Sequence, residues 1–282
     1  KPEQINTSII ESWIFEGKLK TNWSARTIKN RLQALRSFIN WLVKDGYLPN
    51  NPIAKIPYPK IPKNLPKHLI KEDALKLLDW AKHFQYDYTF ERTRGTAIIA
   101  TFIFTGIRLQ ELKNLKMQDV NLTNRTLFVK SGKGEKDRII PLNLRLVEIL
   151  QEYLKDRQRL KKTCPYFFTA LRRDTPMGDL VVKRLINRLR KKSGIHFYPH
   201  LLRHTFATLM LEGGCNLYSL SQMMGHSDIK TTTIYLSATT THLQEQIGKH
   251  PLSNFLEVGH FGRAIKRERE LCGFALPFLL GY

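Results

Sequence analysis

The feature that most constrains this chain is a proline-rich segment, NNPIAKIPYPKIPKNLPKHL, at residues 50–69. Proline removes a backbone hydrogen bond and favours extended conformations, so no continuous helix can cross this segment. The chain must therefore fold separately on either side of it. Lysines between the prolines suit a linker that lies along a polyanion. We expect the linker proper at residues 59–68.

Residues 1–58 are predicted to form a small helical module. In TIKNRLQALRSFINWLVKDG the apolar residues recur at helical spacing, with Ser24 as N-cap and Gly46 as the stop signal. A charged face on one helix is usually only a solvated surface. Here the whole module is basic, and the opposite face of this helix carries Lys29, Arg31 and Arg36.

The rest of the chain is predicted to be mainly α-helical with one β-hairpin. TAIIATFIFTG is apolar on all sides, which indicates a buried central helix. TLFVK and DRIIPL flank SGKGEK, a pattern typical of a hairpin with a glycine turn. The fold class is therefore α+β, mainly α with a small antiparallel sheet, with a second domain at 69–252 and a tail at 253–282. Further helices are expected at 71–84, 144–157, 179–192, 200–212, 218–224 and 229–236.

The charge of the chain points to a polyanionic partner. Lys and Arg number 46 against 24 Asp and Glu, a net charge of +22. Nucleic acid is the commonest partner of such a protein, although a merely soluble basic protein is the alternative. Three widely spaced cysteines, without a CxxC pair, indicate neither a disulfide framework nor a zinc site. No apolar run reaches the roughly 20 residues of a membrane span, so we expect a cytoplasmic protein without membrane contact.

Candidate chemistry begins in PHLLRHTFATLM. His200 and Arg203 stand three apart on a predicted helix and share a face, which suits phosphate binding with proton exchange. His204 could share that face too, but we favour a structural role for it. The HxxxH spacing also fits zinc, yet the arginine between the histidines and the lack of a nearby acid or cysteine argue against a metal.

Two further segments add candidate groups. In MMGHSDIKTTTIYL, His226 follows a helix-ending glycine, and Tyr235 comes nine residues later. A lone tyrosine is usually core or interface, and becomes a candidate nucleophile only if cations and bases converge on it. In TGIRLQELKNLKMQDV, Arg108 opens a predicted helix, where an anion is readily bound, and Glu111 could orient a neighbouring cation.

The hairpin supplies the last candidate. Lys133 stands at its tip between two glycines, which allow close approach to a partner. Such a lysine could reach a phosphate or protonate a leaving oxygen, although an isolated hairpin lysine is more often only solvated. Two residues of the same hairpin, Lys136 and Arg138, and two of the linker, Lys60 and Lys63, are further candidates for DNA contact.

Together these segments resemble the tyrosine recombinase, or phage integrase, family. The resemblance runs through TGIRLQEL, GKGEKDRIIPL, HLLRHTFAT, GHSDIKTTTIY and HLQEQIGKHPL, over roughly residues 24–252. The six positions that match the family's active site are intact: Arg108, Lys133, His200, Arg203, His226 and Tyr235. The module at 1–58 resembles the family's core-binding domain, which implies a C-shaped, two-domain clamp around duplex DNA.

The resemblance implies a mechanism without metal or nucleotide cofactor. Tyr235 would attack a DNA phosphate, forming a 3′-phosphotyrosyl link and releasing a 5′-hydroxyl. Arg108 and Arg203 would stabilise the transition state, with Glu111 holding this clamp. Lys133 would be the general acid for the leaving oxygen. His200 would assist proton transfer from Tyr235, and His226 would donate a hydrogen bond to the phosphate.

The resemblance also implies partners: double-stranded DNA with specific recombination sites, a tetramer of this chain, and accessory DNA-bending factors in the prokaryotic nucleoid. The tail at 253–282 carries no family motif and is expected to dock on a neighbouring protomer. We favour integration or excision of a mobile element, because a chain that starts with Lys suggests a removed N-terminal arm-binding domain. The alternatives are an Xer-type chromosome or plasmid dimer resolvase, a type IB topoisomerase-like relaxing enzyme and a non-catalytic DNA-binding regulator. A metallonuclease is a further alternative, but the sequence offers no carboxylate cluster for its metal ions.

Overall fold

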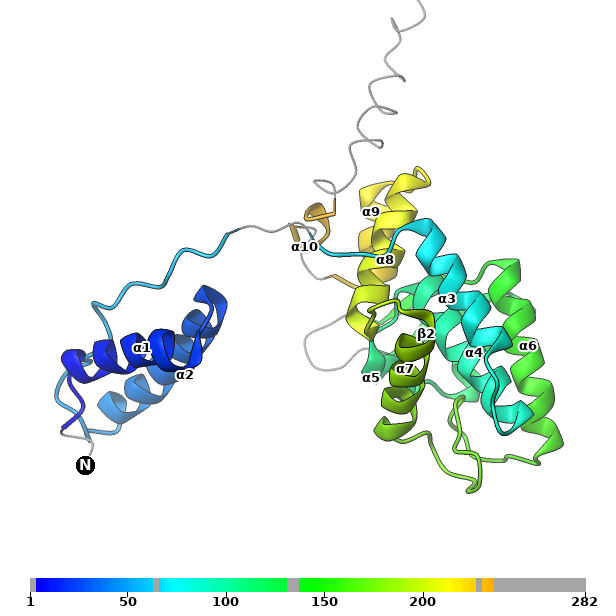
Figure 1. Cartoon of the computed structure of the whole chain (residues 1–282), viewed down its shortest axis with the longest axis horizontal. Coiled ribbons are helices and arrows are strands. Elements are labelled where there is room, and N and C mark those ends of the chain that lie inside the picture. The colour runs from blue at the N-terminus through cyan, green and yellow to red at the C-terminus, as the bar shows by residue number, and fades with distance from the viewer. Residues whose placement is uncertain (1–3, 63–65, 131–136, 227–229, 236–282) are drawn as a thin grey trace, which may run out of the picture. The chain divides into compact units, whose positions relative to one another are not determined.

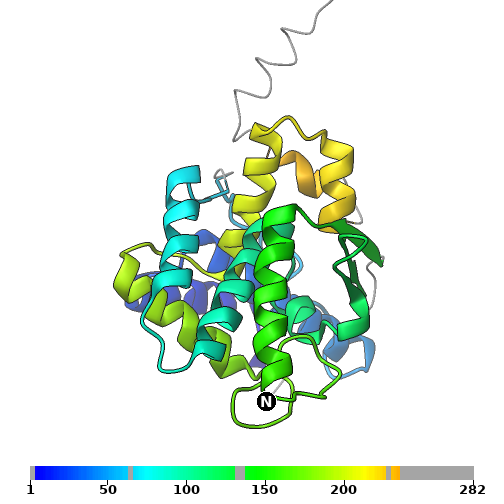
Figure 2. The ribbon, with the colours of Figure 1, turned by 90° about the vertical axis from the view of Figure 1, so that its right-hand side faces the viewer.

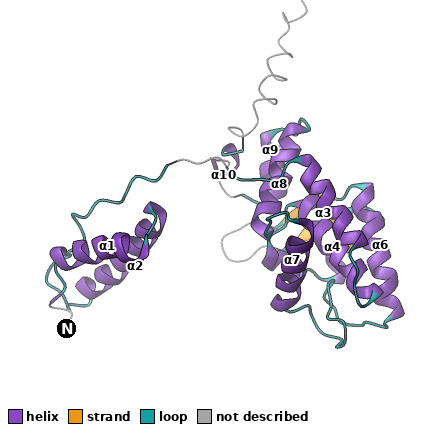
Figure 3. Cartoon of the chain, in the orientation of Figure 1, coloured by secondary structure: helices purple, strands orange, loops and turns teal. Residues whose placement is uncertain are grey.

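The computed structural model describes residues 4–62, 66–130, 137–226 and 230–235. The chain divides into two compact units, Lys1–Asn64 and Leu65–Tyr282, and the boundary falls inside the proline-rich segment. Helices dominate both units (Figure 3). The elements are α1 (Thr7–Thr21), α2 (Ala25–Lys44), α3 (Lys71–His83), α4 (Thr89–Thr105), α5 (Leu109–Asn114), the 3₁₀ helix η2 (Met117–Asp119), β1 (Val120–Asn121), β2 (Thr126–Val129), β3 (Arg138–Pro141), α6 (Leu144–Arg159), α7 (Asp179–Ser193), α8 (Pro199–Glu212), α9 (Leu217–Met224) and α10 (Lys230–Thr233).

The N-terminal unit packs α1 against α2 and the segment that follows α2. The side chain of Ser24 accepts a hydrogen bond from the Thr27 backbone, which confirms the predicted N-cap of α2. The helix ends at Lys44, two residues before the predicted stop at Gly46. The buried face of the unit is small and aliphatic: Ile10, Ile28, Leu32, Ile39, Leu42, Leu48, Ile53 and Ile56.

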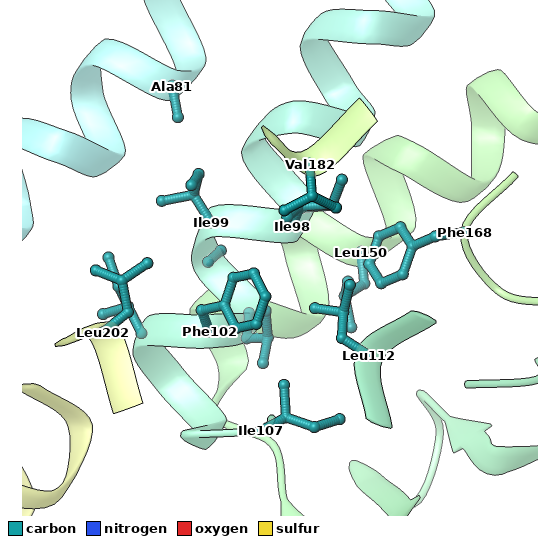
Figure 4. Close-up of a cluster of buried hydrophobic side chains, with 14 of the residues drawn as sticks. Ala81, Ile98, Ile99, Phe102, Ile107, Leu112, Leu150, Phe168, Val182 and Leu202 are labelled. Carbon is teal, nitrogen blue, oxygen red and sulfur yellow. The ribbon is translucent and has the colours of Figure 1, made fainter. Parts of the chain in front are cut away.

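The second unit is built around α4, which packs against α3, α6 and α8 (Figures 1 and 2). Its apolar run has no polar face to offer to water, so neighbouring helices cover it on all sides. Figure 4 shows Ile99 and Phe102 of α4 among side chains from the surrounding elements. The helix begins at Thr89, before the apolar run, because Phe90 is buried and buried Arg94 donates to the carbonyl of Thr169.

A three-stranded antiparallel sheet, in the order β1-β2-β3, lies beside the helices. The predicted hairpin is confirmed, since Leu127 pairs with Ile140 and Phe128 with Ile139. Burial alternates along β2, where Leu127 is buried and Phe128 is exposed. This alternation keeps the register, because a slip by one residue would turn the apolar side chains to water. The hairpin tip lies outside the described residues.

The helices predicted after the hairpin are confirmed, with ends that shift by one or two residues. The last one differs more. A helix was predicted over 229–236, but α10 ends at Thr233, and Tyr235 follows in a turn in which its backbone N–H donates to the Thr232 carbonyl. The tyrosine is therefore held by packing rather than by a long helix: it is buried with Phe206, Leu220 and Met224.

Gly106 joins α4 to α5 and is the residue on which this junction depends. Its φ of 60° is left-handed, and an added Cβ would lie 2.4 Å from the Phe206 ring. Gly194, after α7, has φ 71° but no atom within 4 Å of such a Cβ. We expect Gly194→Ala to cost about 1 kcal/mol of unfolding free energy through backbone strain alone, and Gly106→Ala to cost clearly more. Denaturant unfolding of both variants checks this, and equal losses would contradict it.

Candidate active site

The candidate site forms where the start of α8 meets the α4–α5 junction and the end of α9. Arg203, near the start of α8, is 2% exposed, and its guanidinium lies between the other two segments. It donates to the carbonyl of Gly106, at the α4–α5 junction, at 2.7 Å, and to the carbonyl of Met224, at the end of α9, at 2.6 Å. Burial, and then the charge of Arg108, lower its pKa to about 10, so it remains a cation at neutral pH.

His226 completes the surroundings of Arg203. Nη2 of Arg203 lies 3.1 Å from Nε2 of His226, and Nδ1 of His226 lies 2.7 Å from the Thr232 hydroxyl. A guanidinium can only donate, so Nε2 accepts and Nδ1 carries the proton that bonds Thr232. Burial, followed by the charges of Arg203 and Arg108, lowers the pKa of His226 to about 4 and keeps the ring neutral. The ring therefore orients Arg203 and ties it to α10.

Glu111 is the acid at the centre of the site. Its carboxylate accepts from the backbone N–H of Arg108 at 2.8 Å and from the Arg108 guanidinium at 3.0 Å. On its other side it receives two bonds from Arg138, at 2.8 and 2.7 Å. Arg138 also donates through Nε to the carbonyl of Met223. This one carboxylate thus joins α5, β3 and the end of α9.

The ionisation of Glu111 follows from this environment. Burial alone would raise its pKa, but the hydrogen bonds from Arg138 and the Arg108 backbone, together with both arginine charges, lower it to about 2. The carboxylate is therefore ionised at any pH at which the protein is expected to work. The predicted role of Glu111 in orienting a neighbouring cation agrees with this geometry. Glu111 binds two cations, Arg108 and Arg138, and the second of these was predicted from the sequence to contact DNA.

Arg138 requires a correction. The sequence suggested that it contacts DNA, but it is only 7% exposed, and its guanidinium is taken up by Glu111 and Met223. The alternation along β3 turns it toward the core side of the sheet, where Ile140 is also buried. Arg138 is therefore a positioning residue inside the protein. The pairing could not be read from the sequence, because the two partners are far apart along the chain.

Tyr235 lies within this framework and is 2% exposed. Its hydroxyl is 2.7 Å from Nδ1 of His204. Burial raises the pKa of Tyr235, and the positive charges of Arg203 and Arg108 act in the opposite direction. The sequence favoured a structural role for His204, so this contact was missed. The only signal for it was the four-residue spacing from His200, and the two rings do meet edge to face at 4.6 Å.

His200 lies at the more open end of the same helix face. The residue is exposed overall, but partial desolvation of its ring, followed by the charges of Arg203 and Arg108, lowers its pKa. The structure therefore brings Arg108, Arg203, His226 and Tyr235 together, with His200 at the margin. Lys133 lies outside the described residues, as do Lys136 and Lys63.

The basic residues predicted to contact DNA in the first unit and linker have different surroundings. Lys29 and Lys60 are exposed. Arg31 stacks on the Trp23 ring at 3.8 Å, which leaves it at the surface in a fixed position. Arg36 is half-buried and donates to the carbonyls of Ile53 and Ile56, a structural use that the sequence did not predict.

This arrangement is suited to chemistry at a phosphate. The charges of Arg108 and Arg203 act on the Tyr235 hydroxyl. The imidazole of His226 adjoins Arg203, and that of His204 adjoins the hydroxyl. Fixed cations of this kind stabilise the negative charge that gathers on phosphoryl oxygens in a transition state. The hydroxyl is a nucleophile of the kind that forms covalent intermediates. The site thus holds the residue types that chemistry at a phosphate ester requires.

Comparison with known sequences identifies the family. The phage integrase family profile matches residues 67–242, well over half of the chain. The chain is 36% identical to tyrosine recombinase XerA of Pyrococcus horikoshii, over 83% of this chain and 76% of that protein. It is 35% identical to tyrosine recombinase XerC of Thermodesulfovibrio yellowstonii, over 90% and 85%. The chain therefore belongs to the phage integrase family, and it is a tyrosine recombinase, an enzyme that breaks and rejoins DNA.

Solved structures agree with this assignment. A XerH site-specific recombinase bound to its palindromic difH substrate superposes with a TM-score of 0.71 at 25% identity, covering 87% of this chain and 72% of that one. The Tn1549 transposon integrase superposes with a TM-score of 0.66, covering 88% of this chain and 86% of that one, and its 22% identity supports the fold alone.

None of the described helices is long and apolar enough to cross a membrane.

The central ion pair gives a stability prediction. Glu111→Gln should lower the free energy of unfolding by about 3 kcal/mol or more at neutral pH, because it leaves buried Arg138 without its counter-charge. The matched control is Glu148→Gln, which breaks an exposed pair with Arg145 and should change little. Denaturant titrations of both variants make the comparison. A small loss for Glu111→Gln would contradict the central place given to this carboxylate.

The same pair predicts an acid sensitivity. The pKa of Glu111 is lowered from 4.5 to about 2 by folding, so its contribution is complete above about pH 4.5 and disappears as the pH falls toward 2. The shift corresponds to about 3 kcal/mol. Unfolding measured between pH 5 and about pH 2 should show a steeper loss in the natural protein than in Glu111→Gln. Parallel curves would refute this.

Proposed function

We propose that this enzyme is a site-specific recombinase that cleaves DNA by attack of Tyr235 on a backbone phosphate. The attack forms a 3′-phosphotyrosyl link and releases a 5′-hydroxyl, and the 5′-hydroxyl of a partner strand then reverses the step. The observation that carries this proposal is the burial of the Tyr235 hydroxyl beside His204 and within the field of Arg203 and Arg108. No bond energy is lost, because the phosphodiester is conserved as a phosphotyrosine ester.

Each active-site residue then has a distinct role. Arg108 and Arg203 hold the phosphoryl oxygens, and Glu111 with Arg138 fixes Arg108 in place. Lys133 protonates the departing 5′ oxygen, and His200, at the open end of α8, assists proton transfer during the reaction. His226, whose Nε2 accepts from Arg203 in this structure, donates a ring N–H to the phosphate once the phosphate has replaced it as the partner of Arg203.

The two units bind duplex DNA as a clamp joined by the proline-rich linker. The excess of positive charge and the exposed Lys29, Arg31 and Lys60 support DNA binding that weakens steeply with salt. Lys63 and Lys136 are proposed to add to the same contacts. Recombination is proposed to take place in a tetramer on two DNA sites, aided by accessory DNA-bending factors. The tail at 253–282, which lies outside the described residues, is proposed to dock on a neighbouring protomer.

The biological role is proposed to be Xer-type resolution of chromosome or plasmid dimers. The expectation from the sequence was a mobile-element integrase, and that role remains the second candidate. The observation in favour of the Xer role is that relatives at 35–36% identity carry Xer names, whereas the likeness to the transposon integrase is one of fold. Cleavage assays on DNA from the chromosome terminus and from the ends of a resident element discriminate between the two.

Tyr235→Phe tests the nucleophile. The variant should bind DNA with unchanged affinity, since only one oxygen is removed, and should form no covalent protein–DNA adduct. The measurement is a denaturing gel with labelled DNA that carries a nick, which traps the adduct. Tyr218→Phe, at an exposed tyrosine of α9, is the matched control and should react normally. An adduct formed by Tyr235→Phe would rule out the assignment.

Lys133→Ala tests the leaving-group acid. The variant should be slowed strongly on ordinary DNA but much less on DNA whose bridging 5′ oxygen is replaced by sulfur, because a thiolate leaves without a proton. Single-turnover rates on both substrates provide the comparison, with Lys116→Ala, at the N-cap of η2, as control. An equal loss on the two substrates would remove Lys133 from this role.

A further inference from the structure

His204 is held against Tyr235 by features on both sides of the contact. On α8, the next residue, Thr205, receives the backbone N–H of Leu69 on its hydroxyl and bonds back to the carbonyl of Leu201. The His200 ring meets the His204 ring edge to face. Tyr235 is fixed by the apolar cluster of Phe206, Ala207, Leu211, Leu220 and Met224. The 2.7 Å contact is therefore a product of packing and not of a chance rotamer.

The groups around His204 keep it unprotonated. They are His200 and Arg203 on α8, and His68 from the segment that precedes α3. Burial is the largest cause, and the electrostatic interactions with these three groups add to it, so the pKa of His204 is lowered to about 4. At neutral pH the ring is neutral and has one nitrogen lone pair. With its proton on Nε2, it presents that lone pair at Nδ1 to the Tyr235 hydroxyl.

We propose that His204 is a further catalytic residue, which takes the proton of Tyr235 as the phenol oxygen attacks the phosphate. This inference rests on the proposed function. The O–H bond of Tyr235 breaks and its proton passes to Nδ1. The phenol oxygen bonds to phosphorus while the bond to the 5′ oxygen breaks, and that oxygen takes its proton from Lys133. In rejoining, Nδ1 returns the proton to Tyr235.

His204 is better placed for this step than His200. Its nitrogen already touches the reacting oxygen, whereas His200 is exposed and packs its ring on His204. The DNA phosphate that enters beside Arg203 brings negative charge near His204 and stabilises the imidazolium that forms. His200 is then a positioning residue: its ring packs on His204 and holds it in place beside Tyr235.

The test separates proton transfer from packing with three variants. His204→Asn places an amide group near the position of Nδ1 and can keep a hydrogen bond to Tyr235, but it takes up no proton. His204→Ala removes both functions. His83→Ala, at an exposed histidine of α3, is the matched control. The full chain is used throughout, with nicked DNA as the probe, and the measurements are DNA affinity and single-turnover adduct formation.

We expect His204→Asn and His204→Ala to bind DNA like the natural protein and to form adduct about 10²–10⁴-fold more slowly, the range for loss of a general base. His83→Ala should keep the full rate. A His204→Asn variant that reacts at the natural rate would overturn the proposal, because a hydrogen bond alone would then suffice. Adduct at Tyr235 in the natural protein with no loss in either variant would sink this inference and leave the proposed function intact. Absence of any adduct at Tyr235 would refute the proposed function itself.

A second measurement separates proton transfer from packing in variants that fold. Difluorotyrosine at position 235 is a more acidic phenol and needs less help in losing its proton. If His204 takes that proton, the rate ratio between the natural residue and His204→Asn should shrink in the fluorinated proteins. An unchanged ratio, with both proteins folded by thermal melting, would assign His204 to packing and contradict the proposal.

Discussion

The buried ion pair between Glu111 and Arg138 is the interaction on which the site depends. One carboxylate receives two bonds from Arg138 and two from Arg108, so it joins the start of α5 to β3 and, through Met223, to the end of α9. Breaking one half of a buried pair leaves a charge in a low-dielectric interior, which is costly. The same bonds therefore stabilise the second unit and fix the position of a guanidinium at its surface.

A second set of bonds extends this framework to Tyr235. Arg203 ties the α4–α5 junction to the end of α9, His226 ties Arg203 to Thr232, and the Thr232 carbonyl receives the backbone N–H of Tyr235. The tyrosine is thus linked to the arginines through hydrogen bonds rather than through a rigid helix. The arginines that are proposed to bind the phosphate and the tyrosine therefore belong to one hydrogen-bond network.

Much of this could be predicted from the sequence, and the limit is physical. Helical periodicity, the Ser24 cap and the glycine-flanked hairpin are local signals, and each predicted its element. The family motifs predicted one site of six residues: Arg108, Lys133, His200, Arg203, His226 and Tyr235. The structure brings Arg108, Arg203, His226 and Tyr235 together, with His200 at the margin and Lys133 outside the described residues. The side-chain pairings are different, because Glu111 with Arg138 and Tyr235 with His204 join distant segments, and no local pattern encodes such contacts. For that reason Arg138 was predicted to contact DNA, the contact of His204 with Tyr235 was not predicted, and the last helix was predicted to extend beyond Thr233.

The most direct test of the account is to identify the residue that carries the DNA. Protein trapped on nicked DNA would be digested with trypsin, and the peptide bearing a nucleotide located by mass spectrometry. Attack by Tyr235 predicts a 3′-phosphate linked to the peptide of residues 231–249, whose one tyrosine is Tyr235. A nucleotide on any other peptide, or a link to a 5′-phosphate, would contradict it.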